Sequence, residues 1–172
     1  MTDRSNALPR RWTATLSGAA IVALLALAAL PAAPLHAAST QPLASAPTNW
    51  DGVELALMAV ERKGNVLTVK WAVTNGADGR TSVRFGLTAK ATSYLVDEEN
   101  GTKYFVLTDK EGRGLASEHE WTGSSYGVTD RVEPGQTKRY WMKFPAPPPE
   151  VTSIGVFFTG ADPLEGVAIT DL

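Results

Sequence analysis

The sequence contains no cysteine among its 172 residues and only two histidines. Without cysteine the chain has no disulfide bonds, no thiol nucleophile, no lipid-modified cysteine and no thiolate ligands for zinc or iron–sulfur clusters. The 16 basic and 18 acidic residues nearly balance, so the chain lacks the basic excess that is typical of nucleic-acid binding. These absences exclude disulfide scaffolds, thiol enzymes and nucleic-acid-binding proteins.

The first 38 residues have the pattern of a secretory signal peptide. An uninterrupted apolar run at 19–30 is shorter than the roughly 20 residues that span a bilayer. Small residues follow it, and we expect cleavage after Ala37 or Ala38. Three arginines form the positive region that precedes the apolar run: Arg4, Arg10 and Arg11.

An uncleaved membrane anchor is the alternative, because the wider window 14–35 reaches spanning length. In either case the positive-inside rule places the rest of the chain outside the cytoplasm. The predicted location is therefore secreted or extracytoplasmic, at the cell envelope. Contact with the membrane is expected only if the signal segment is retained.

The remainder divides into a linker and one domain. Residues 39–50 are rich in Ser, Ala, Thr and Pro, which predicts a disordered linker. Residues 51–172 have the length of a single domain with its own core. Because residues 1–38 hold three of the 16 basic and one of the 18 acidic residues, the rest carries a net charge of −4.

Apolar residues alternate with polar ones through most of residues 51–172, and turn signals recur every 8 to 12 residues. Asn100-Gly101 between two β-rich runs predicts a hairpin. Asn75-Gly76 predicts a chain break, because Asn and Gly tolerate positive φ. We expect strands at Val53–Ala59, Leu67–Val73, Val83–Leu87, Ser93–Asp97, Lys103–Leu107, Lys138–Phe144, Val151–Thr159 and Val167–Leu172.

This pattern predicts an all-β fold, an antiparallel β-sandwich of seven to nine strands, with a small closed barrel as the alternative. No segment after residue 39 has the apolar period of a helix. The polar stretch 115–130 is predicted to be a long loop. The proline-rich stretch 145–149 is predicted to connect two strands in a polyproline II conformation.

Three groups of residues carry a family resemblance: the strand Val69–Asn75 that ends before a Gly turn, Leu95-Val96-Asp97 with Gly101 and Tyr104, and Pro134-Gly135 ahead of a strand that ends at Phe144-Pro145. In these features the chain resembles secreted bacterial immunoglobulin-like domains of unknown function, grouped with the immunoprotective extracellular protein superfamily. The resemblance implies an immunoglobulin-like β-sandwich behind an N-terminal signal or lipid anchor. It supplies no catalytic residues.

Residues 123–127 match G-x-S-x-G, the nucleophile elbow of serine hydrolases. That elbow requires a helix after the serine and a histidine later in the chain, whereas His119 precedes Ser125 and no helical pattern follows. His119 lies between two glutamates and is expected to be a solvated loop residue. We therefore predict no enzyme activity, no catalytic residue and no cofactor.

Metal binding is predicted to be absent as well, because transition metals draw on several imidazole or sulfur donors. Calcium is an alternative that the sequence leaves open. Asp97–Asn100 offers four oxygen-bearing side chains in succession. The same composition is typical of an exposed hairpin tip.

The strand at 138–144 carries the candidate binding surface. Its alternation places Arg139, Trp141 and Lys143 on the polar face, opposite a face of apolar side chains. A tryptophan between two cations offers a platform for a ligand or partner, and Trp121 and Tyr126 in the predicted loop extend it. The competing interpretation is that a neighbouring segment covers Trp141.

The sequence therefore predicts an exported, non-catalytic binding or interaction module. Its partner would be an unidentified protein or glycan at the cell envelope, and not a nucleic acid. A carbohydrate-binding accessory protein that uses Trp121, Tyr126 and Trp141 is the alternative function.

Overall fold

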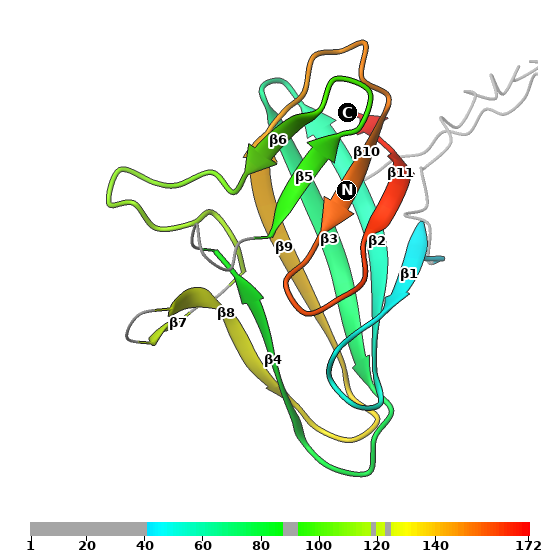
Figure 1. Cartoon of the computed structure of the whole chain (residues 1–172). Helices are drawn as coiled ribbons and strands as arrows, with labels where there is room; N and C mark the ends of the chain where they lie inside the picture. Colours follow the sequence, from blue (N-terminus) through cyan, green and yellow to red (C-terminus); the bar gives the residue numbers. More distant parts are fainter. Residues whose placement is uncertain (1–40, 88–92, 118–119, 123–124) are drawn as a thin grey trace, which may run out of the picture. The chain divides into compact units, whose positions relative to one another are not determined.

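The computed structural model describes residues 41–87, 93–117, 120–122 and 125–172, with only the backbone described at 120–122, 125 and 126. All of them belong to the unit that spans residues 37–172, and the predicted signal peptide lies outside them. This part of the chain contains no helix, and so none long and apolar enough to cross a membrane. It forms twelve strands (Figure 1): β1 (Ala44–Pro47), β2 (Val53–Lys63), β3 (Val66–Asn75), β4 (Thr81–Gly86), β5 (Tyr94–Asp97), β6 (Thr102–Phe105), β7 (Glu120–Thr122), β8 (Ser125–Val132), β9 (Thr137–Pro145), β10 (Ser153–Phe157), β11 (Leu164–Ala168) and β12 (Thr170–Asp171).

Three sheets build the predicted β-sandwich. The first has the order β1-β2-β3-β9, and the second has the order β11-β10-β5-β6. The third has the order β4-β8-β7, and all pairings are antiparallel except β12 with β2. Figure 1 shows β5 and β10 in front of β2 and β3, and apolar side chains from all three sheets form one core. The strands outnumber the expected seven to nine because short segments such as β7 and β12 also pair.

Strand β3 follows the predicted alternation. Leu67, Val69, Trp71 and Val73 are fully buried on its inner face. The Trp71 ring meets Phe85 edge-on at 5.1 Å between centroids, and Phe158 at 4.5 Å. Aromatic side chains bury more apolar area than any other type, so this contact between the first and third sheets lies at the centre of the core.

A β-bulge at Met58 changes the inward face of β2. Leu57 pairs with Trp71 and Ala59 with Lys70, so Met58 has no partner in β3. An extra residue reverses the alternation beyond it. The expectation that Ala59 faces the core is therefore wrong: Ala59 is half-buried, and Val60 is fully buried instead.

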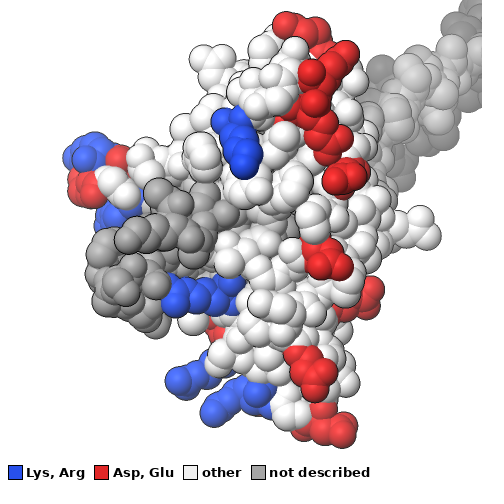
Figure 2. Space-filling view, viewed as in Figure 1, with Lys and Arg blue, Asp and Glu red and all other residues white. Residues whose placement is uncertain are grey.

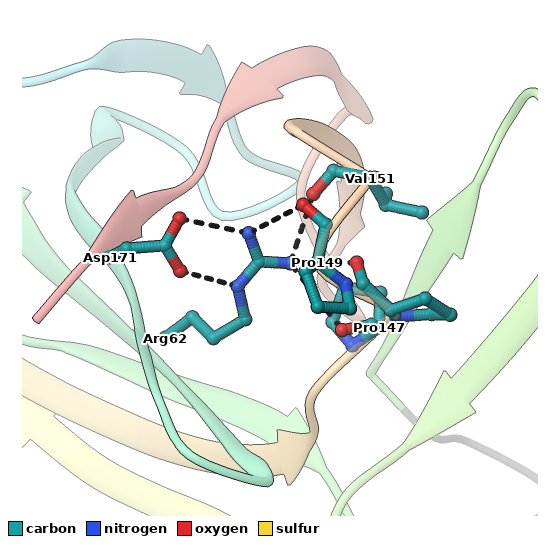
Figure 3. A network of polar contacts seen from close by, with 6 residues as sticks. Arg62, Pro147, Pro149, Val151 and Asp171 are labelled. Atoms are coloured by element: carbon teal, nitrogen blue, oxygen red, sulfur yellow. Dashed lines mark hydrogen bonds and ion pairs between the residues drawn. The ribbon is translucent and has the colours of Figure 1, made fainter.

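Because of the bulge, Arg62 also turns inward and is buried (Figure 3). Its Nη1 donates to the carbonyls of Pro148 at 2.8 Å and Val151 at 3.1 Å, and its Nη2 donates to the carbonyl of Pro149 at 3.2 Å. Nε and Nη2 also bind the two carboxylate oxygens of Asp171 in β12. One guanidinium thus fixes the proline connector between β9 and β10 and the end of the chain.

The linker predicted at 39–50 is wrong in its second half. Ala44–Pro47 is strand β1, which pairs with Glu54–Leu57 of β2. Ala46 is buried, whereas Ser45 is exposed. Small side chains suit this position because an edge strand gains stability from backbone hydrogen bonds and one buried methyl group.

The long loop predicted at 115–130 is also wrong. Strand β8 pairs with β4 through residues 127–132, and Val128 and Val132 are fully buried. Between them Asp130 accepts hydrogen bonds from Lys138 at 2.7 Å and from the Tyr140 hydroxyl at 3.2 Å, which interrupts the apolar alternation. At Gly127 a Cβ atom would lie 2.6 Å from the Phe85 carbonyl oxygen, so this pairing needs glycine.

Asn75 ends β3 through its side chain. Its Nδ2 donates to the carbonyls of Gly79 at 2.8 Å and Val132 at 2.9 Å, and its Oδ1 accepts from the amide of Ala77 at 3.0 Å. Gly76 has no positive φ, so the chain break was predicted for the wrong reason. The fully buried Asn75 amide joins the end of β8 to the loop after β3.

Candidate binding surface

The structure places the predicted cationic residues on the outer face of the first sheet. Arg139 and Trp141 are exposed and Lys143 is half-buried, while the alternate residues Tyr140, Met142 and Phe144 are buried. The register brings Arg139, Trp141 and Lys143 opposite Ala72, Lys70 and Thr68 of β3. The predicted parity of β9 is confirmed.

Trp141 remains 38% exposed, so its neighbours cover it only in part. Lys143 Nζ lies 5.7 Å from the centroid of the Trp141 ring, within cation–π range. Lys70 is paired with Glu61 at 2.7 Å. Among the described residues, no carboxylate lies within ion-pair distance of Arg139 or Lys143. This face therefore carries a tryptophan and two cations.

The predicted contribution of Trp121 and Tyr126 to this patch lies outside the described side chains. They are partners across the β7–β8 ladder, in the third sheet, and their side chains lie outside the described part. Ser125, the serine of the G-x-S-x-G match, begins β8. A strand follows this serine where the nucleophile elbow requires a helix.

Sequence reasoning missed a row of three aromatic side chains on the outer face of the second sheet. Phe157 of β10 pairs with Tyr94 of β5, which pairs with Phe105 of β6. The rings of Tyr94 and Phe157 stack at 4.9 Å with an interplanar angle of 7°, and Phe105 lies 6.3 Å from Tyr94. Phe105 is 54% exposed, against 38% for Trp141.

Charge surrounds this aromatic row. Lys103 Nζ lies 4.4 Å from the centroid of the Tyr94 ring. The hairpin tip beyond it holds the exposed carboxylates of Glu98 and Glu99. Figure 2 shows this face of the domain, with a largely uncharged surface over β5 and β10 and acidic side chains gathered toward its upper right. The row is therefore an apolar strip with a charged border, formed by Lys103 and the acidic hairpin tip.

The Asp97 carboxylate forms its hydrogen bonds within the hairpin tip. Asp97 is buried, and its two carboxylate oxygens accept hydrogen bonds from the Asn100 backbone amide at 3.0 Å and the Asn100 side-chain amide at 2.8 Å. These bonds to Asn100, the side-chain bond first, hold the pKa of Asp97 below its usual range. Among the described residues, no three His, Cys, Asp or Glu side chains come together as metal ligands do.

A shallow pocket of about 430 Å³ lies where β1 turns into β2. Trp50, Asp51 and Glu54 contribute to its wall. The Trp50 ring packs edge-on against Phe85 at 5.4 Å, so it belongs to the rim of the core. The pocket contains none of the predicted site residues.

One sequence signal did point to the aromatic row. The predicted hairpin at Asn100-Gly101 sets Asp97 opposite Thr102, and this register places Tyr94 opposite Phe105. The contribution of Phe157 had no such signal, because β10 joins β5 across a long separation in sequence.

Comparisons of this chain with protein-family models, with curated proteins and with solved structures found no match. The family resemblance therefore remains a prediction from the residues that carry it.

Proposed function

We propose that this chain is an exported, non-catalytic binding module that recognises a partner protein through the aromatic row Tyr94, Phe105 and Phe157. The observation that carries the proposal is the exposure of Phe105 at the end of this row, on the outer face of β10-β5-β6. Protein-binding sites are enriched in aromatic side chains that sit within an uncharged centre and a polar rim. The row and its charged border have that arrangement.

The row is also held in place before any partner arrives. Tyr94 contacts Phe157 through stacked rings and Lys103 through its ammonium group. Side chains that are already ordered lose less conformational entropy on binding. Because the rings of Tyr94 and Phe157 stack on each other, each has one face covered by the other. A sugar stacks on a free ring face, so this arrangement favours a protein partner.

A carbohydrate-binding accessory function is the second candidate. It is supported by the exposed ring of Trp141, with Arg139 and Lys143 on the same face of β9. Export is supported by the pattern of residues 1–38 alone.

Photo-crosslinking separates the two candidates. A benzophenone amino acid replaces Phe105 in one variant and Trp141 in another, with exposed Thr74 as the control position. We expect a discrete protein adduct from position 105 in envelope fractions of the producing cell. Added in excess without the crosslinker, the Phe105→Ser variant should reduce the yield of this adduct less than the wild-type protein does. Its unfolding midpoint should stay close to that of the wild type.

An adduct at position 74 of equal yield would contradict the assignment, as would the absence of an adduct at 105. Glycan-array binding that is lost in Trp141→Ala and kept in Phe105→Ser would instead favour the second candidate. N-terminal sequencing of the mature protein tests the predicted cleavage of the signal peptide. An intact Met1 in an exported fraction would mean that the signal segment is retained as an anchor.

A further inference from the structure

Two asparagine–glycine steps occur in the described chain, at Asn75-Gly76 and Asn100-Gly101. In such a step the glycine backbone nitrogen attacks the asparagine Cγ, and the side-chain nitrogen leaves as ammonia. Water then opens the succinimide ring to give aspartate or isoaspartate. Glycine hinders this attack least because it has no side chain and a freely rotating backbone.

The structure protects Asn75. Its side chain is fully buried, and both its nitrogen and its oxygen are engaged, with Gly79, Val132 and Ala77. The backbone nitrogen of Gly76 donates to the carbonyl of Gly52 at 2.8 Å. The attacking nitrogen is therefore held by a hydrogen bond, and the buried Asn75 side chain is shielded from water.

Asn100 lies in a more exposed environment. It is exposed at the tip of the β5–β6 hairpin, followed by Gly101 at a φ of 65°. Its Nδ2 donates to Asp97 at 2.8 Å, and among the described residues no donor binds its Oδ1. The carbonyl oxygen that must accept negative charge during the attack therefore faces solvent, with water available to open the ring.

We propose that Asn100 is a site of spontaneous deamidation, with water as the co-reactant and ammonia as the product, and that Asn75 is not. The reaction replaces an amide that donates to Asp97 with a carboxylate that repels it. It also adds charge beside Glu98 and Glu99. Conversion therefore weakens the turn that closes the hairpin.

The test uses the full chain, incubated folded in mildly alkaline buffer and sampled over time. Labelling by an isoaspartyl methyltransferase, followed by peptide mapping, measures conversion at each step. We expect conversion of the Asn100 peptide, and conversion at Asn75 at least about a thousandfold slower, because Asn75 reacts only from the unfolded state.

The Asn100→Gln variant should lose the label from that peptide and keep the rest of the map unchanged. The same chain in denaturant should convert at both steps. Equal rates at Asn75 and Asn100 in the folded protein would overturn the proposal. So would an intact Asn100 in the folded protein at a time when the denatured chain has converted there.

Discussion

Buried polar side chains connect the parts of this sandwich that are distant in sequence. Asn75 ties β3 to β8, and Arg62 ties β2 to the proline connector and to β12. Each makes hydrogen bonds through nearly all of its polar atoms, as a buried polar group must. The indole nitrogen of Trp71 is an exception, buried without a partner in a ring that fills the core.

Replacement of Asn75 by alanine should destabilise the fold. The carbonyl of Val132 and its neighbours would lose a buried partner, and we expect a loss of about 2–4 kcal/mol in the free energy of unfolding. Urea titration followed by tryptophan fluorescence measures the loss. Asn65→Ala, in an exposed turn, is the matched control and should change stability little. Similar losses in both variants would contradict the role given to Asn75.

Elements whose two faces differ sharply in polarity were predicted well. Strand β3 keeps every second residue from Leu67 to Val73 apolar and fully buried, so its inner face followed from the sequence, as did the parity of β9. Strand β1 was missed because its residues are small, and β8 was missed because Asp130 occupies an inward position. The partner of β8 in β4 is also distant in sequence, and local patterns do not encode such a pairing.

Strand β1 supplies a test at the level of the element. Ala46→Asp places a carboxylate on the buried face of β1, whereas Ser45→Asp places the same charge on the exposed face. We expect Ala46→Asp to lower stability by about 2–4 kcal/mol, and Ser45→Asp by less than about 0.5 kcal/mol. Denaturant unfolding of the two variants measures the difference. Equal effects would be expected only if 39–50 were the disordered linker that its composition predicts.

The candidate surface shows the same limit of sequence reasoning. The patch of Arg139, Trp141 and Lys143 lies within one strand, so the alternation of that strand predicted that the three side chains share a face. The row of Tyr94, Phe105 and Phe157 comes from three strands, and β10 reaches β5 only in the folded sheet. A surface that spans strands needs the strand order as well as the alternation.

The whole domain should lose stability in acid. Hydrogen bonds from Arg62 and Asn100 lower the pKa values of Asp171 and Asp97, and Asp130 also has a lowered pKa because its hydrogen bonds outweigh its burial. A carboxylate with a lowered pKa in the folded state stabilises the fold above its ordinary pKa, near 3.8. That contribution disappears as the pH falls through the lower, folded value.

The urea midpoint should therefore stay level near neutrality and fall as the pH drops from about 5 to about 2. Asp171→Asn should flatten this decline, because the variant has no proton to gain at that position. Asp51→Asn, at an exposed carboxylate without an ion pair among the described residues, should leave the slope unchanged. A midpoint that rises on acidification would contradict the assignment.

The bulge at Met58 has one more consequence. If Met58 were kept and paired regularly in the ladder, the two-residue alternation of β2 would send Glu61 into the interior and Arg62 out to solvent. The carbonyls of the proline connector would then face an acid in place of a base. The extra residue at Met58 therefore decides which charged side chain of β2 meets the proline connector.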